Sequence, residues 1–221
     1  MSHYVAANVV RLVAGSNIAL DPPAGLGLVT VAANVAPIGI AFKPGDYQLL
    51  NSHAGTPQSS FAIVQNELRA LPFAISRTST LVRLGITAST TGQTGALTRI
   101  GIYADDDMGH PGKLVIDAGT VTTNPTGSKE ITVNVTLTPG VYWAAVVCQN
   151  CPTSRPGLVG YIDGSWLTNY LGTVIPAGTV QPVGVYQSGV SGALPTTFTV
   201  TGAIPYTSNG DGVPRVFAKG N

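Results

Sequence analysis

The sequence predicts an all-β protein, and three observations support this fold class. Many short segments alternate apolar and polar residues with a period of two, and clusters of Gly, Pro, Asp or Asn separate them. The 221 residues include 27 glycines and 16 prolines, which favour many turns. Charged residues make up only 10% of the chain, against about 25% in an ordinary globular domain, which argues against exposed helices. Residues 61–68 form the one helical candidate, and nothing predicts long helices alternating with strands.

Residues 1–45 differ from the rest and are interpreted as an N-terminal attachment or trimerisation segment. Ile18 and Leu20 alternate with Ala19, a turn follows at Asp21–Gly25, and Leu28–Val31 reads as a second strand. An isolated β-hairpin of two strands is marginal in water. We therefore expect this hairpin to pack against the remaining chain or against copies of itself.

The first strands of residues 46–221 are predicted from period-two alternation. After a turn-rich connector at 37–57, strand patterns occur at 73–75 and at 81–87. Strands at 97–103 and 113–116 flank an acidic turn and the pair Pro111-Gly112, which is typical of an antiparallel hairpin.

The later strands complete a predicted sandwich. Residues 131–137 place Ile131, Val133, Val135 and Leu137 on one face, whereas 141–147 is apolar on both faces, as expected of a central strand. That strand contains Trp143, which we expect in the core. Patterns at 183–186, 197–201 and 213–217 end the series. About eight strands with turns between them predict a two-sheet antiparallel β-sandwich that is jelly-roll-like.

Two sets of motifs resemble phage structural proteins. AGSNIAL (14–20) and GLVTV (27–31) are similar to short repeats of trimeric phage tail fibres. RIGIYADD (99–106), PGKLV (111–115) and LTPGVYWAAVV (137–147) resemble a β-sandwich module of phage tail and fibre proteins and of some secreted carbohydrate-binding proteins. The chain departs from long fibres in its brevity, because it has neither a fibre shaft nor a chaperone domain. A tail-tip, minor tail or capsid-attached component fits that brevity.

The resemblance implies a virion structural protein whose sandwich contacts the host surface. Its partners would be other tail or capsid proteins, two further copies in a homotrimer, and a host-surface glycan receptor. Two alternatives stay open, namely a free-standing carbohydrate-binding module and a purely structural decoration or adaptor protein. Replacing Trp166 with Ala should disable an adhesin and leave an adaptor intact.

Charge and motif content exclude several function classes. The net charge of +1 gives no electrostatic reason to expect nucleic acid or an anionic membrane as a partner. No run reaches the roughly 18 apolar residues of a membrane span, and no signal-peptide pattern is present. We expect synthesis in the host cytoplasm and localisation to the virion. The sequence contains no nucleophile elbow and no phosphate loop, and Glu67 and Glu130 are its only glutamates, so we do not expect an enzyme.

Aromatic residues in a turn-rich region are the candidates for glycan binding. Aromatic faces stack on the apolar faces of sugars, and neighbouring Asp and Asn side chains supply hydrogen bonds. The alternative is that these aromatics are core or corner residues of the sandwich. The candidate residues are Tyr161, Asp163, Trp166, Asn169, Tyr170 and Tyr186.

Two further motifs have competing interpretations. Asp105, Asp106 and Asp107 could bind Ca²⁺ through carboxylate oxygens, or they could form a solvated turn whose side chains cap backbone N–H groups. No other cofactor is expected. Cys148 and Cys151 lack the partners of a zinc site, which leaves a local disulfide or two turn thiols.

One long segment carries no charge. Residues 164–210, 47 in a row, contain no Asp, Glu, Lys or Arg. Buried strands with neutral turns would explain this composition, and so would a surface covered by a neighbouring subunit.

Overall fold

The structure is a computed structural model that describes residues 18–21, 30–33, 39–50, 58–161, 182–205 and 212–221. The chain divides into two compact units, Met1–Ala36 and Pro37–Asn221. In the first unit, β1 (Ile18–Asp21) pairs antiparallel with β2 (Thr30–Ala33). No helix that could span a bilayer occurs among the residues listed above.

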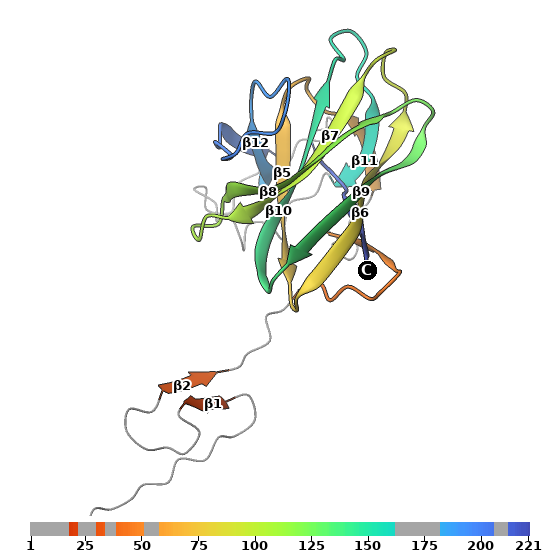
Figure 1. Cartoon of the computed structure of the whole chain (residues 1–221). Helices are drawn as coiled ribbons and strands as arrows, with labels where there is room; N and C mark the ends of the chain where they lie inside the picture. Colours follow the sequence, from red (N-terminus) through yellow and green to blue (C-terminus); the bar gives the residue numbers. More distant parts are fainter. Residues whose placement is uncertain (1–17, 22–29, 34–38, 51–57, 162–181, 206–211) are drawn as a thin grey trace, which may run out of the picture. The chain divides into compact units, whose positions relative to one another are not determined.

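The second unit contains a six-stranded antiparallel sheet with the strand order β13-β12-β5-β10-β7-β8 (Figure 1). Strand β10 lies near its centre, between β5 and β7, as its two apolar faces predict. The strands of this sheet are β5 (Leu68–Ile75), β7 (Leu97–Asp105), β8 (Pro111–Thr122), β10 (Gly140–Gln149), β12 (Pro182–Gln187) and β13 (Gly202–Pro205).

A seven-stranded sheet completes the unit. Its main path is β14-β11-β6-β15-β3, with β4 paired to β11 and β9 paired to β6. Its strands are β3 (Tyr47–Leu49), β4 (Gln58–Ala62), β6 (Ser79–Thr90), β9 (Gly127–Leu137), β11 (Gly157–Tyr161), β14 (Val213–Pro214) and β15 (Phe217–Gly220). One of the two sheets curls into a half-barrel. The all-β class and its antiparallel sheets are therefore confirmed.

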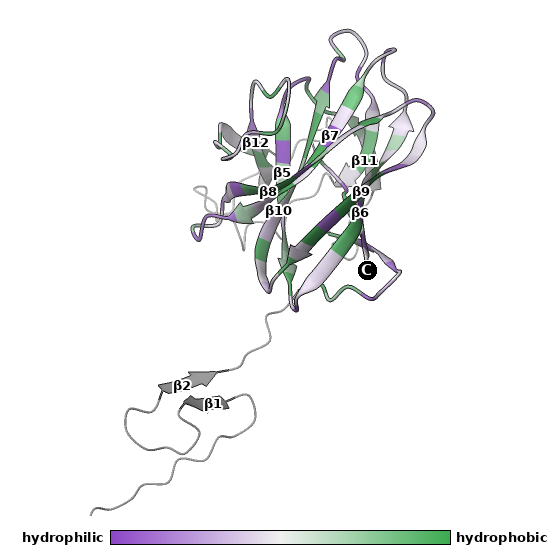
Figure 2. Ribbon diagram, viewed as in Figure 1, coloured by the Kyte–Doolittle hydropathy of each residue, from purple (hydrophilic) through white to green (hydrophobic). Residues whose placement is uncertain are grey.

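The main hydrophobic core lies between the two sheets. Ile102 and Val146 of the six-stranded sheet join Leu84, Ile86 and other apolar residues of the seven-stranded sheet in one buried cluster. Along β9, Val133 and Leu137 are buried while the alternating polar residues are exposed, as the period of two predicts. Figure 2 shows the same contrast between apolar strands and polar turns.

A second core covers the opposite face of the six-stranded sheet. It forms beneath residues 188–201, which we call the covering segment. The indole of Trp143 is fully buried there, so its prediction as a core residue is confirmed. The Phe198 ring packs edge-on against Tyr103, with 5.3 Å between ring centroids. Both faces of β10 are apolar because each faces its own core.

Polar bonds fasten the covering segment to this sheet. The Tyr103 hydroxyl donates to the Pro195 carbonyl at 3.0 Å, and the Gln149 amide donates to the Gly192 carbonyl at 2.7 Å. The Phe198 N–H donates to the Gly112 carbonyl at 2.9 Å. These bonds satisfy polar groups that would otherwise be buried without partners.

Several sequence predictions were wrong or incomplete. The helix at 61–68 does not form, because Phe61 lies in β4, Leu68 begins β5, and Asn66 between them has a φ of 61°. The strand at 197–201 reduces to a single bridge from Thr197, since the covering segment pairs mainly through loop contacts. The connector at 37–57 contributes β3, and strands β4, β11 and β13 were not predicted.

Candidate functional site

A groove lies on the outer face of the seven-stranded sheet. Because Leu84 and Ile86 of β6 point into the core, Gly85 and Thr87 face outward. Strands β3, β15, β6 and β9 lie side by side here, and their outward residues enclose a volume of about 520 Å³. We call it the Tyr47 groove. Its lining residues are Tyr47, Leu49, Thr87, Ser128, Glu130, Arg215 and Phe217.

The groove depends on the absence of a side chain at Gly85. Gly85 pairs with Phe217 on one side and with Glu130 on the other. A Cβ atom at Gly85 would collide with the Phe217 ring and with the Lys129 carbonyl oxygen. The Phe217 ring therefore lies over the space that any other residue at position 85 would fill. A glycine inside a strand often marks such a close approach.

Tyr47 spans the groove from β3 towards β9. Its hydroxyl donates to Glu130 Oε2 at 2.6 Å, and this hydrogen bond to a carboxylate raises the pKa of Tyr47. The Tyr47 ring meets the Phe217 ring edge-on at 5.8 Å, and Lys219 Nζ lies 5.2 Å from its centroid. Tyr47 is nevertheless 51% exposed, so a ligand can reach its ring.

Cations outnumber carboxylates around the groove. Arg83 Nε lies 3.8 Å from Glu130 Oε1, at the limit of an ion pair. Lys219 lies beside the Tyr47 ring, and Arg215 lines the groove directly. Arg215 Nε is buried and has no hydrogen-bond partner among the described residues. Two aromatic rings bordered by polar groups suit a ligand that stacks and forms hydrogen bonds.

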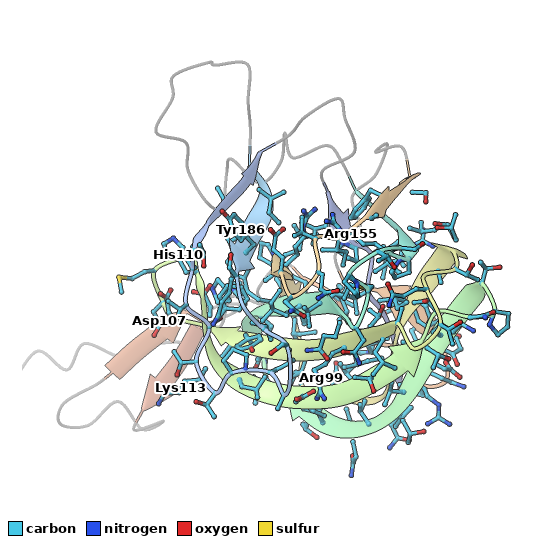
Figure 3. All side chains as sticks on the ribbon, turned by 90° about the horizontal axis from the view of Figure 1, so that it is seen from above. Arg99, Asp107, His110, Lys113, Arg155 and Tyr186 are labelled. Atoms are coloured by element: carbon cyan, nitrogen blue, oxygen red, sulfur yellow. A yellow bond between two sulfur atoms is a disulfide. The ribbon has the colours of Figure 1, made fainter. Side chains whose placement is uncertain are left out.

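The predicted glycan-binding residues do not form one described site. Asp163, Trp166, Asn169 and Tyr170 lie outside the described residues. Tyr161 ends β11 in the seven-stranded sheet, whereas Tyr186, labelled in Figure 3, belongs to β12 in the six-stranded sheet.

Tyr186 can be described further. A Cβ atom at Gly202 would lie 3.1 to 3.3 Å from the Tyr186 ring and hydroxyl, so this side chain packs against β13. The proposal that these six residues bind a glycan stays a prediction.

The aspartates of the β7–β8 turn accept hydrogen bonds from the protein itself. Asp105 Oδ1 accepts the indole N–H of Trp143 at 2.8 Å, and Asp105 Oδ2 accepts the Asp107 N–H at 3.0 Å. Asp106 Oδ1 accepts the N–H groups of Met108 at 2.8 Å and His110 at 3.0 Å. Burial alone would raise the pKa of Asp106, but these hydrogen bonds outweigh it and lower the pKa.

This geometry matches the capping interpretation of the turn. Figure 3 shows Asp107 and His110 at the same end of the domain. In the parts of the chain that the structure describes, no group of three or more His, Cys, Asp or Glu side chains is arranged to hold a metal ion. Calcium binding by Asp105, Asp106 and Asp107 stays a prediction that this arrangement does not support.

Of the two states that the sequence leaves open for Cys148 and Cys151, a local disulfide or two turn thiols, the structure shows the disulfide. Cys148 near the end of β10 forms a disulfide with Cys151, and both residues are buried. The Cys151 N–H donates to the Gln65 side-chain oxygen at 2.8 Å, which joins this turn to the segment before β5. The pair belongs to the core and not to the Tyr47 groove.

The sequence pattern did not reveal the groove. Tyr47, Glu130 and Phe217 are far apart in the chain: Tyr47 lies in the predicted connector, Glu130 just before the strand predicted at 131–137, and Phe217 at the end of the one predicted at 213–217. The one local signal was Gly85 within an alternating apolar strand. Comparison with protein-family models, with curated proteins and with solved structures finds no match for this chain. The likeness to phage tail proteins therefore rests on the quoted motifs alone.

Proposed function

We propose that this chain is a virion structural protein, a phage tail-fibre or minor-tail component whose sandwich binds a glycan on the host surface. Motifs at 99–106 and 137–147 support the phage setting through their resemblance to tail and fibre modules. The Tyr47 groove is the observation that carries the binding function. It combines an exposed aromatic ring with polar groups on a sheet face, as saccharide sites require.

The groove supplies both kinds of contact that a sugar needs. The Tyr47 and Phe217 rings offer apolar surface for the C–H face of a pyranose. Ser128 and Thr87 add hydroxyl groups beside that surface, and Arg215 adds N–H donors. Because Tyr47, Phe217, Ser128 and Thr87 come from four adjacent strands, the sheet backbone holds their side chains in a fixed arrangement.

Assembly would use other parts of the chain. Under this proposal residues 1–45 form a hairpin that attaches the protein to the tail or capsid and trimerises it, while a jelly-roll-like sandwich carries the receptor site. The uncharged residues 164–210 would supply a further subunit contact. A free-standing carbohydrate-binding module would use the same groove without partners, whereas an adaptor would not need it.

The test compares single substitutions of the full-length protein on an array of bacterial surface glycans. Tyr47→Ala removes the exposed ring and the hydrogen bond to Glu130, and we expect glycan binding about tenfold weaker. Trp166→Ala and Tyr186→Ala probe the residues predicted from the sequence. Met108→Ala is the control, because Met108 is 79% exposed at the β7–β8 turn, outside the groove.

Each outcome of this comparison discriminates between functions. Loss of binding with Tyr47→Ala alone supports the groove, and loss with Trp166→Ala alone moves the site to residues outside it. Glycan binding by a stable monomer with no affinity for virion proteins would favour the free-standing module. A protein that binds no glycan but assembles into virions would be an adaptor, which would contradict the receptor-binding proposal.

A further inference from the structure

The Tyr47 groove has a charge asymmetry that bears on its ligand. The whole chain has a net charge of only +1, yet three cations, Arg83, Arg215 and Lys219, lie in or beside the groove. Glu130 is the one carboxylate among the described lining residues. It already accepts the Tyr47 hydroxyl and lies 3.8 Å from Arg83. The lining itself holds one cation, Arg215, and one carboxylate, Glu130, so the excess of positive charge comes from Arg83 and Lys219 beside it.

Arg215 is the cation among the residues that line the groove. Its backbone N–H donates to the Val159 carbonyl at 3.0 Å, which fixes the residue between β14 and β15. Its Nε atom is buried without an acceptor among the described residues. The residue as a whole is only partly buried and lines the groove, so a ligand would meet the accessible part of this cationic side chain.

The position of Arg215 relative to the aromatic rings suggests how the ligand lies. Arg215 precedes Phe217 by two residues, and both side chains line the groove. Two residues of extended chain span about 6.6 Å, so one sugar residue can touch the Phe217 ring and the Arg215 side chain together. An arginine matches a carboxylate through two parallel N–H···O bonds, which a neutral hydroxyl cannot form.

We propose that the Tyr47 groove binds an acidic saccharide, with the sugar ring against Phe217 and Tyr47 and its carboxylate on Arg215. This inference rests on the proposed glycan-binding function and specifies its ligand class.

The experiment measures binding of the full-length protein by calorimetry to three carboxylated polysaccharides. These probes are polygalacturonate, hyaluronan and polysialic acid, each compared with its carboxyl-reduced, neutral form. We expect at least one acidic form to bind about tenfold or more tightly than its neutral form, since hydrogen bonds between charged groups are the stronger ones. The preference should weaken as salt is raised.

Variants assign that preference to Arg215. Arg215→Leu should reduce the ratio of acidic to neutral affinity to about one. Arg215→Lys should keep part of it, because the charge remains while the planar fork is lost. Arg155→Leu is the matched control, since Arg155, labelled in Figure 3, lies in the exposed loop between β10 and β11 and is not one of the residues that line the groove. Circular dichroism and the midpoint of urea unfolding establish that each variant is folded. If Arg215→Leu does not fold, Arg83→Gln tests the contribution of a cation beside the groove.

The results separate this inference from the function on which it rests. If the acidic and neutral forms bind with equal affinity and Tyr47→Ala abolishes that binding, the acidic ligand is overturned and the glycan site is kept. An acidic preference that Arg215→Leu leaves unchanged would also overturn the inference. Binding to neither form of any probe, together with a glycan array without signal, would overturn both.

Discussion

Asp117 joins the six-stranded sheet to the covering segment. Its Oδ2 atom accepts Arg99 Nη1 at 2.7 Å and the Leu194 N–H at 3.0 Å. Its Oδ1 atom accepts the Gly119 N–H at 3.0 Å. Burial alone would raise the pKa of Asp117, but the three hydrogen bonds and the charge of Arg99 outweigh it and lower the pKa. The ionised carboxylate therefore stabilises the folded state.

We predict a specific pH dependence from Asp117. The pKa of Asp117 is lower in the folded than in the unfolded chain. Its contribution to the free energy of unfolding is therefore complete above about pH 4 and is lost as the pH falls through the pKa of the folded state. Urea unfolding of wild type and Asp117→Asn between pH 2 and pH 7 measures this contribution. The difference in free energy of unfolding between wild type and Asp117→Asn should shrink below about pH 4.

Asp107→Asn is the control for this measurement. Asp107 is exposed at the tip of the β7–β8 turn, so its substitution should change stability little at any pH. If the free energy of unfolding of Asp117→Asn stays below that of wild type by the same amount down to pH 2, the role assigned to the carboxylate charge is contradicted.

At the scale of elements, the covering segment should behave as part of the core. We predict that Phe198→Ala lowers the free energy of unfolding by about 3–5 kcal/mol, because it removes a buried ring that packs against Tyr103. Val200→Ala, on an exposed residue of the same segment, should stay within about 0.5 kcal/mol of wild type. Equilibrium denaturation measures both. If both substitutions changed the free energy of unfolding by similarly small amounts, the covering segment would detach without unfolding the two sheets.

The sequence predicted elements where burial follows local alternation. Strand β9 shows the expected pattern, and β10 has the apolar faces of a central strand. Prediction failed where tertiary contacts decide the structure. Residues 61–68 have an apolar spacing that fits a helix, but Phe61 pairs with β11 in one sheet and Leu68 pairs with β12 in the other. Residues 197–201 alternate like a strand, yet they cover a sheet face and do not extend a sheet.

At the scale of the whole molecule, the proposed trimer is tested by mass. Light scattering of the full chain should give about three times 22.6 kDa if the protein self-associates. A chain that begins at Pro37 retains the second compact unit and should be monomeric if residues 1–36 hold the trimer together. A trimer that survives this truncation would assign the interface to the sandwich. A monomer in both cases would contradict self-assembly of the isolated protein.

The candidate site could be predicted only in part. The expectation of aromatic stacking identified a suitable chemistry, but it selected residues close together in sequence, between 161 and 186. The Tyr47 groove instead gathers side chains from strands that become neighbours only in the folded sheet. A sequence pattern reports which face a residue occupies, and it does not report which distant strand lies beside it.

The bond between Tyr47 and Glu130 joins residues 83 positions apart, and Phe217 reaches the same groove from β15. Such non-local pairings form slowly, because the chain must close long loops before they gain any stabilisation. The groove consequently exists only after β3, β6, β9 and β15 have all come together. A ligand or antibody that binds across these strands would report that this part of the seven-stranded sheet has formed and would not bind chains in which these strands are still apart.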